Sequence, residues 1–272
     1  MKRERLRGWR RIADAMWHGP DDPQIYGSLD VDATALSAHL AAERAAGHPI
    51  TVTHLVGRAL AIALAEVPEV NVRLVGGYAI PRESVDVFFI TSVAAGRELS
   101  GVKIANADRK SARDVARELT DRAKRLRAGD DPDLAKSKAL LERLPKAMLR
   151  VALRVSAFVA GERAHSIPSL GLRASPFGSA IVTSVGMFGL PSGFAPISWM
   201  YNVPVLVLVG EITEKPVAID GAVHVRPIVP ICATFDHRYV DGWHVSKLLV
   251  AFRSYLAAPS SHERGELPSH AR

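Results

Sequence analysis

Apolar residues recur along the chain at two spacings, one typical of helices and one typical of strands. Spacings of three and four residues predict helices over residues 6–17, 33–46, 51–67, 111–127 and 242–256. Short apolar runs predict strands over residues 24–31, 85–93, 102–105, 179–184, 204–212 and 228–235. Gly76-Gly77 and Asp220-Gly221 are two-residue turn signals that predict hairpins. These hairpins pair residues 72–74 with 78–80 and 217–218 with 222–225.

Helices and strands are interleaved without the regular alternation of βαβ units, and the hairpins require antiparallel pairing. We therefore predict an α/β fold with a mixed, largely antiparallel sheet covered by helices. The helical pattern of residues 133–161 restarts at Pro145, with Lys146, Arg150 and Arg154 on one face and Met148, Ala152, Val155 and Val159 on the other. Such a segment is either an interfacial membrane helix or a packed helix with a basic wet face; we favour the packed helix.

Composition narrows the class of protein. The chain has 272 residues, of which 48% are hydrophobic and 23% charged, so it is not intrinsically disordered. A single cysteine, Cys232, excludes a disulfide scaffold. The longest apolar runs, such as residues 203–209, are too short to span a bilayer, and no signal peptide is visible. These features predict a soluble protein of the cytoplasm, and we expect no association with a membrane.

The net charge of +7 raises the question of a polyanionic partner. Basic residues are concentrated in residues 1–11, 103–127 and 136–163, but no nucleic-acid-reading motif accompanies them, so we expect no nucleic acid partner. Solvated helix faces account for most of this charge. A small polyanion such as a nucleotide or coenzyme A is the remaining interpretation.

Residues 231–249, ICATFDHRYVDGWHVSKLL, form the segment richest in chemistry. His237 follows a predicted strand, and Asp241 comes four residues later. His237, Asp241 and His244 would share a face of one continuous helix and could then hold a metal ion. However, Gly242 and the preceding strand place His237 in a strand-to-helix loop, so we expect no metal site.

A second segment, residues 179–196, reads SAIVTSVGMFGLPSGFAP. The strand carrying Thr183 and Ser184 runs into Gly186 and Gly189, where the backbone must turn tightly or approach a ligand closely. From composition alone, Thr183 is no more than a β-forming residue in a strand.

Taken together, these segments resemble a known family. FDHRYVDG before an apolar helix and IVTSVGMFG with FAPI are similar to the two signatures of the dihydrolipoamide acyltransferase cores of 2-oxo acid dehydrogenase complexes. RRIADAM, SLDVDATAL and IANADRKSARDVA also match, in the family's order, between about Arg10 and Leu256. The resemblance implies a chloramphenicol acetyltransferase-like fold and a homotrimer with active sites between subunits.

The resemblance also assigns roles. Coenzyme A is a substrate, His237 is the general base that takes a proton from the acceptor thiol, and Thr183 stabilises the tetrahedral intermediate. Asp241 is expected to anchor the His237 loop through an arginine, with Arg10 and Arg11 as candidates. Ser184, Phe188 and Arg238 are the expected substrate-binding residues.

The chain also departs from the family. Full-length members carry a lipoyl domain, a linker and a subunit-binding domain, whereas this sequence is expected to start at the catalytic core, without a covalent lipoyl group. The acceptor is then a free thiol or a lipoyl group on another protein, and dehydrogenase-complex subunits are candidate partners. We expect the acyltransferase domain over residues 1–258, with a mostly helical insertion at about 129–175. A polar, frayed tail over residues 259–272 favours an isolated trimer.

Three functions remain open on these grounds. A CoA-dependent acyltransferase that transfers the acyl group directly to a dihydrolipoyl-like thiol is favoured. A thioester hydrolase on the same fold would use water in place of the thiol. A non-catalytic trimeric scaffold or assembly partner would need neither His237 nor Thr183.

Overall fold

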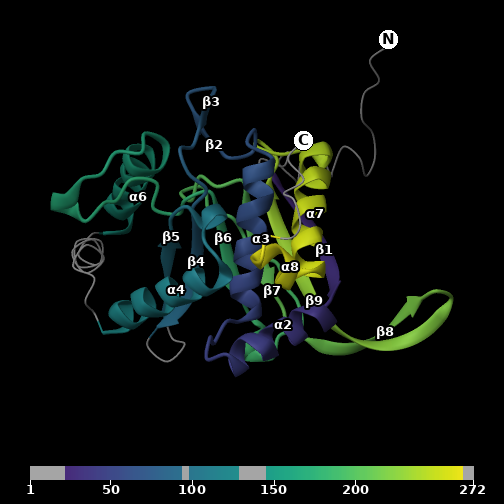
Figure 1. The fold of residues 1–272 in the computed structure, drawn as a ribbon. Helices are drawn as coiled ribbons and strands as arrows, with labels where there is room; N and C mark the ends of the chain where they lie inside the picture. Colours follow the sequence, from purple (N-terminus) through teal and green to yellow (C-terminus); the bar gives the residue numbers. More distant parts are fainter. Residues whose placement is uncertain (1–21, 94–97, 129–144, 266–272) are drawn as a thin grey trace, which may run out of the picture.

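The computed structural model describes residues 22–93, 98–128 and 145–265 and shows one large sheet with helices packed on one face (Figure 1). The strands lie in the order β1-β9-β7-β6-β4-β5, and β8 pairs with β9. Pairs β4–β6 and β6–β7 are parallel and the others antiparallel, so the predicted mixed, largely antiparallel sheet is confirmed. The strand bounds are β1 Gln24–Asp32, β4 Val87–Val93, β5 Glu98–Ile104, β6 Ala180–Ser184, β7 Val205–Val209, β8 Thr213–Ile219 and β9 Ala222–Asp236.

The helices that cover the sheet are α2 (Thr34–Ala45), α3 (Val52–Glu66), α4 (Ala112–Arg127) and α7 (Gly242–Ala257). Helix α3 is the most deeply buried of them, and its Leu55, Ala59 and Leu64 are fully shielded from solvent. It approaches the sheet closely because Gly57 has no side chain: a Cβ there would overlap the ring of Phe89 on β4. The main core thus lies between α3, α7 and the sheet.

The opposite face of the sheet is covered by the loop over residues 185–204. A second, smaller core forms there from Ile181, Ile197, Val203 and Leu206. Two hydrogen bonds fix the loop to the sheet: Thr234 Oγ1 donates to Ala195 O at 2.8 Å, and Ile197 N donates to Gln24 Oε1 at 2.7 Å. The loop that follows Thr183 is therefore a folded part of the domain.

Several local predictions are confirmed. Helix α4 begins after Ser111, whose hydroxyl accepts a hydrogen bond from Asp114 N at 3.1 Å. Strands β2 (Val72–Val75) and β3 (Tyr78–Pro81) form the hairpin at Gly76-Gly77, but as a separate two-stranded sheet. The predicted helix over residues 6–17 and the polar break after Gly129 lie outside the described residues.

Two predictions differ from the structure at the C-terminal half. The strand predicted at 228–235 and the hairpin strand at 222–225 are one continuous strand, β9. The tail does not fray at Pro259, because Pro259–Glu263 form α8 and dock onto the domain. Glu263 Oε1 accepts from Tyr255 Oη at 2.6 Å, and its Oε2 accepts from Ala112 N at 2.8 Å at the start of α4.

Helix α6 (Lys146–Ser156) continues into a π-helical turn at Ala157–Glu162, and it lies away from the main helical layer (Figure 1). The expected packed apolar face is only partly buried. Met148 and Val155 of that face are 57% and 54% exposed, whereas Ala152 and Val159 are half-buried. Among the residues that the structure describes, nothing buries Met148 and Val155. Within the described ranges, no helix is long and apolar enough to cross a membrane.

Candidate active site

His237 lies in the short turn between β9 and α7. Its backbone N donates to Pro23 O at 2.7 Å, which ties the turn to the segment leading into β1. The His237 side chain is exposed, and its imidazole has no hydrogen-bond partner among the residues that the structure describes. The backbone of His237 is therefore fixed, while its imidazole is exposed to solvent.

The residues immediately before and after His237, Asp236 and Arg238, form an ion pair. Arg238 folds back onto the buried carboxylate of Asp236: Arg238 Nε lies 3.0 and 3.1 Å from the two oxygens, and the backbone N of Arg238 donates to Oδ1 at 3.0 Å. These hydrogen bonds raise the pKa of Arg238. Arg238, an expected substrate-binding residue, fixes the turn that presents His237, and its side chain is 56% exposed.

Asp241 is the N-cap of α7. Its Oδ1 accepts from Trp243 N at 3.0 Å and from His244 N at 3.1 Å, and lies 2.7 Å from His244 Nδ1. The bonds from His244 lower the pKa of Asp241, with a smaller contribution from Trp243. Its recorded partners belong to α7 rather than to an arginine, and Arg10 and Arg11 lie outside the described residues.

The alternative metal site does not assemble. Asp241 and His244 contact each other in the α7 cap, and His237 stands apart from both in the preceding turn. Across residues 22–93, 98–128 and 145–265, no group of three or more histidine, cysteine or carboxylate side chains is placed to hold a metal ion.

A buried network of side chains lies behind the turn, and no local sequence pattern indicates it. Tyr239 Oη donates to Asn202 Oδ1, and Arg82 donates to Asn202 O at 2.6 Å and to Val72 O at 3.1 Å. Burial raises the pKa of Tyr239 and lowers that of Arg82 to about 10, so Arg82 stays charged at neutral pH. The network joins the His237 turn to the β2–β3 hairpin, a contact over more than a hundred residues that no local pattern could indicate.

Thr183 and Ser184 occupy the last two positions of β6, and both are half-buried. The Thr183 hydroxyl has no recorded partner within the described part of the chain. Immediately after, the chain turns at Gly186–Phe188 and lies against the end of β7: a Cβ on Gly186 would stand 2.6 Å from Gly210 O. This turn leaves Phe188, an expected substrate-binding residue, 55% exposed.

The sheet register separates Thr183 from His237 within one chain. Thr183 pairs with Leu208 on β7, and Leu208 pairs with Cys232 on β9. His237 lies five residues beyond Cys232. At about 3.3 Å per residue and about 4.8 Å between strands, the two Cα atoms are roughly 19 Å apart. One chain alone does not bring the two side chains together.

These features define an α/β protein with an exposed histidine in a strand-to-helix turn. The chain matches the model of the family described as 2-oxoacid dehydrogenases acyltransferase (catalytic domain) over residues 1–132 and 148–262. It therefore belongs to that family. The match leaves out residues 133–147, which lie inside the segment expected to be an insertion.

Individual proteins agree with the family match. The chain is 24% identical to the lipoamide acyltransferase component of the branched-chain alpha-keto acid dehydrogenase complex of Bacillus subtilis, over 86% of this chain and 46% of that protein. A probable dihydrolipoamide acetyltransferase from Listeria monocytogenes has a TM-score of 0.64 and 24% identity, covering 94% of both chains. Dihydrolipoamide acetyltransferase from Azotobacter vinelandii has a TM-score of 0.65 and 20% identity, covering 90% of this chain and 85% of that one.

These likenesses show that the predicted fold is correct. Because the solved structures are less than 25% identical to this chain, they establish the shared fold and no more. The chain spans about half the length of the curated relatives it matches. Activity, substrates and partners therefore belong to a proposal for this chain.

Proposed function

We propose that this protein is a CoA-dependent acyltransferase that moves an acyl group between coenzyme A and a thiol acceptor of the dihydrolipoyl type. The observation that carries the proposal is the His237 turn. It holds an imidazole with no intramolecular hydrogen-bond partner among the described residues, on a backbone fixed by Pro23 O and by the Asp236–Arg238 pair. Histidine suits this role because its pKa is close to neutral pH.

Thr183 supplies the second group. Its hydroxyl lacks a recorded partner within the described part of the chain and stands at the end of β6, but it lies too far from His237 of the same chain to act with it. We infer that each active site takes His237 from one subunit and Thr183 from the next, in a homotrimer. Ser184 and Phe188, which adjoin Thr183, would then line the substrate side of the same junction.

In the proposed step, the His237 imidazole removes the proton from the acceptor thiol as its sulfur attacks the thioester carbonyl carbon. The carbonyl oxygen becomes an oxyanion, to which the Thr183 hydroxyl donates a hydrogen bond. When the intermediate collapses, the carbon–sulfur bond to coenzyme A breaks and the imidazolium returns the proton to the departing thiolate. No acyl-enzyme forms, and no proton is gained or lost overall.

One relative supports the choice of residues. In the Azotobacter vinelandii dihydrolipoamide acetyltransferase, a serine, a histidine and an asparagine four positions after that histidine have been investigated for their role in catalysis. His237 and Asp241 have the same spacing, and Thr183 carries a hydroxyl group as serine does. Asp241 acts, in our proposal, by capping α7 and so fixing where the His237 turn ends.

The acceptor and partners follow from the relatives' chemistry. Lipoamide acyltransferases act within 2-oxoacid dehydrogenase complexes, so a dihydrolipoyl group carried by another protein is the acceptor we propose. Subunits of such a complex are then the partners that would deliver it. Free dihydrolipoamide is the simplest substitute in an assay.

The proposal is tested by acyl transfer from a panel of acyl-CoAs to dihydrolipoamide, with products identified by mass spectrometry. We expect His237→Ala to abolish transfer and Thr183→Ala to reduce it about 10²–10³-fold. Lys247→Ala, an exposed change on α7, serves as the matched control and should keep the wild-type rate. Full activity in both active-site variants would refute the assignment. Acid release without any thiol would indicate a hydrolase instead.

A further inference from the structure

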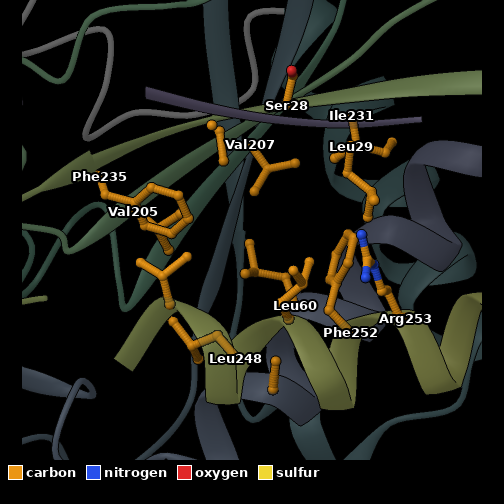
Figure 2. A pocket seen from close by; sticks show the side chains of 15 residues that line it. Ser28, Leu29, Leu60, Val205, Val207, Ile231, Phe235, Leu248, Phe252 and Arg253 are labelled. Atoms are coloured by element: carbon orange, nitrogen blue, oxygen red, sulfur yellow. The ribbon is translucent and has the colours of Figure 1, made fainter. Parts of the chain in front are cut away.

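A cavity of about 130 Å³ lies in the main core, between the sheet and helices α3 and α7. Its walls are the apolar side chains of three strands and two helices (Figure 2). They include Leu60 and Ala63 of α3, Val205 and Val207 of β7, Ile231, Ala233 and Phe235 of β9, and Leu248 and Phe252 of α7. Ser28, on the adjoining β1, points away from it (Figure 2).

Arg253 of α7 lies at one end of this cavity. Figure 2 shows its guanidinium beside the ring of Phe252, below Leu29. Arg253 and Leu29 also line a surface hollow formed by β1, α2 and α7, so this end of the cavity meets solvent. Arg253 is exposed and makes no hydrogen bond or ion pair with any residue that the structure describes.

The shape and chemistry of this arrangement suit an amphiphile. An apolar cavity offers water no hydrogen-bond partners, so it favours an apolar ligand. An engineered cavity of about 150 Å³ with similar walls binds benzene. The space therefore accepts an apolar tail of about six carbon atoms. A guanidinium at the mouth can bind a carboxylate through two parallel hydrogen bonds.

The charges around the mouth favour a monoanion over a phosphate. Asp30 and Asp32 border the same hollow. Asp30 is paired with Lys215 at 3.0 Å, and Asp32 accepts from Thr34 N at 2.8 Å, so each has its own partner. Both carboxylates would nevertheless repel a dianionic head group more strongly than a single carboxylate.

We propose that the cavity between α3, α7 and the sheet binds a short-chain monocarboxylate, with its tail among Ala233, Leu60 and Leu248 and its carboxylate on Arg253. The mouth lies twelve residues along α7 from Asp241, about 18 Å at 1.5 Å per residue. The mouth is therefore separate from the His237 turn, although Phe235 in the cavity wall lies two residues before His237. The inference does not depend on the proposed function.

The test is calorimetric titration of the full chain with hexanoate, alongside hexan-1-ol, acetate and hexyl phosphate. We expect saturable hexanoate binding, with acetate and hexyl phosphate binding at least tenfold more weakly. Arg253→Gln should weaken hexanoate at least about tenfold and leave hexan-1-ol unchanged, because it removes a charge-assisted hydrogen bond and spares the cavity. Arg44→Gln, at an exposed arginine of α2, should bind hexanoate as the wild type does.

Filling the cavity gives a second, independent measurement. Ala233→Val adds two methyl groups to a β9 position that lines the space, so we expect lost hexanoate binding at an unchanged or raised Tm. His237→Ala should bind hexanoate normally, even though acyl transfer is lost. The proposal is overturned if hexanoate shows no saturable binding, if Arg253→Gln binds it as tightly as the wild type, or if hexyl phosphate binds more tightly than hexanoate.

Discussion

Arg238 and Asp236 form an ion pair directly across the residue that we assign as the general base. The carboxylate of Asp236 is buried, and it receives both the backbone N and the guanidinium of Arg238. His237 is therefore held between two residues that are fixed to each other, while its own side chain stays exposed. The turn is rigid without using the imidazole for its own stability.

This pairing predicts a positioning effect on catalysis. Asp236→Asn removes the charge but keeps the shape, so the Arg238 guanidinium should detach and the His237 turn should loosen. We expect kcat to fall about 10- to 100-fold, the loss that a displacement of about 1 Å can cause, with little change in KM for acyl-CoA. Steady-state kinetics measures both constants. An unchanged kcat would show that the ion pair has no part in placing His237.

A glycine-to-alanine change in α3 should act against the usual rule for helices. Alanine at an open helix position stabilises by about 1 kcal/mol relative to glycine. Gly57→Ala would instead drive a methyl group into the Phe89 ring, and we expect a loss of about 1–3 kcal/mol in the free energy of unfolding. Urea denaturation measures this. Ser37→Ala on the exposed face of α2 is the control and should be neutral or stabilising.

His54 makes the fold sensitive to acid. Burial lowers its pKa from 6.5 to about 4, and its Nδ1 accepts from Thr51 N at 3.0 Å in the cap of α3. In the unfolded chain His54 becomes protonated as the pH falls below 6.5, whereas in the folded chain it stays neutral until about pH 4. Neutral His54 makes its full contribution to the free energy of unfolding above pH 6.5. About 3 kcal/mol of that free energy is lost as the pH falls to 4.

His54→Gln tests this linkage, because glutamine at this helix position can still reach back to Thr51 N but does not titrate. Urea unfolding at pH 7 and pH 4.5 gives the acid loss of each protein. The loss should be smaller in the variant by about 2–3 kcal/mol. Equal losses in both proteins would mean that His54 is not held neutral in the fold.

Glu263 should be needed for stability although it lies beyond the expected end of the domain. It joins Tyr255 of α7 and Ala112 of α4, and Arg58 Nε of α3 lies 3.6 Å away. Glu263→Gln removes the charge that offsets Arg58, and we expect a loss of about 1–3 kcal/mol. Glu214→Gln on the exposed strand β8 should cost almost nothing. Thermal and urea unfolding measure the loss in each variant. An equal loss of free energy of unfolding in Glu263→Gln and Glu214→Gln would contradict this prediction.

The sequence predicted the elements whose patterns are local. The stripe of Leu55, Leu60 and Leu64 placed α3, and Ser111 placed the start of α4. The strands predicted over residues 222–225 and 228–235 are joined in the structure as β9. Pro230 lies where β9 changes its neighbour, because the β8 ladder ends at Ile228 and the β7 ladder begins at Ile231, so the missing N–H donor of Pro230 coincides with an interruption of the ladder.

The candidate site was predicted less completely, because its supports are distant in sequence. The two sequence motifs indicate His237, Thr183 and Asp241 as site residues, and this remains a prediction. No periodic pattern could indicate that Asn202 joins Tyr239 to Arg82, or that α8 would dock through Glu263. Likewise, the roughly 19 Å between Thr183 and His237 follows from strand register, which depends on how β6, β7 and β9 pair.

Subunit complementation tests the shared site most directly. His237→Ala and Thr183→Ala proteins are each unfolded, mixed in equal amounts and refolded together, and dihydrolipoamide acylation is compared with that of each variant refolded alone. If every site combines His237 of one chain with Thr183 of another, random mixing restores about a quarter of the wild-type rate, since that share of junctions keeps both residues. A mixture no more active than the average of the two separate variants, with mixed oligomers verified by mass spectrometry, would contradict the account.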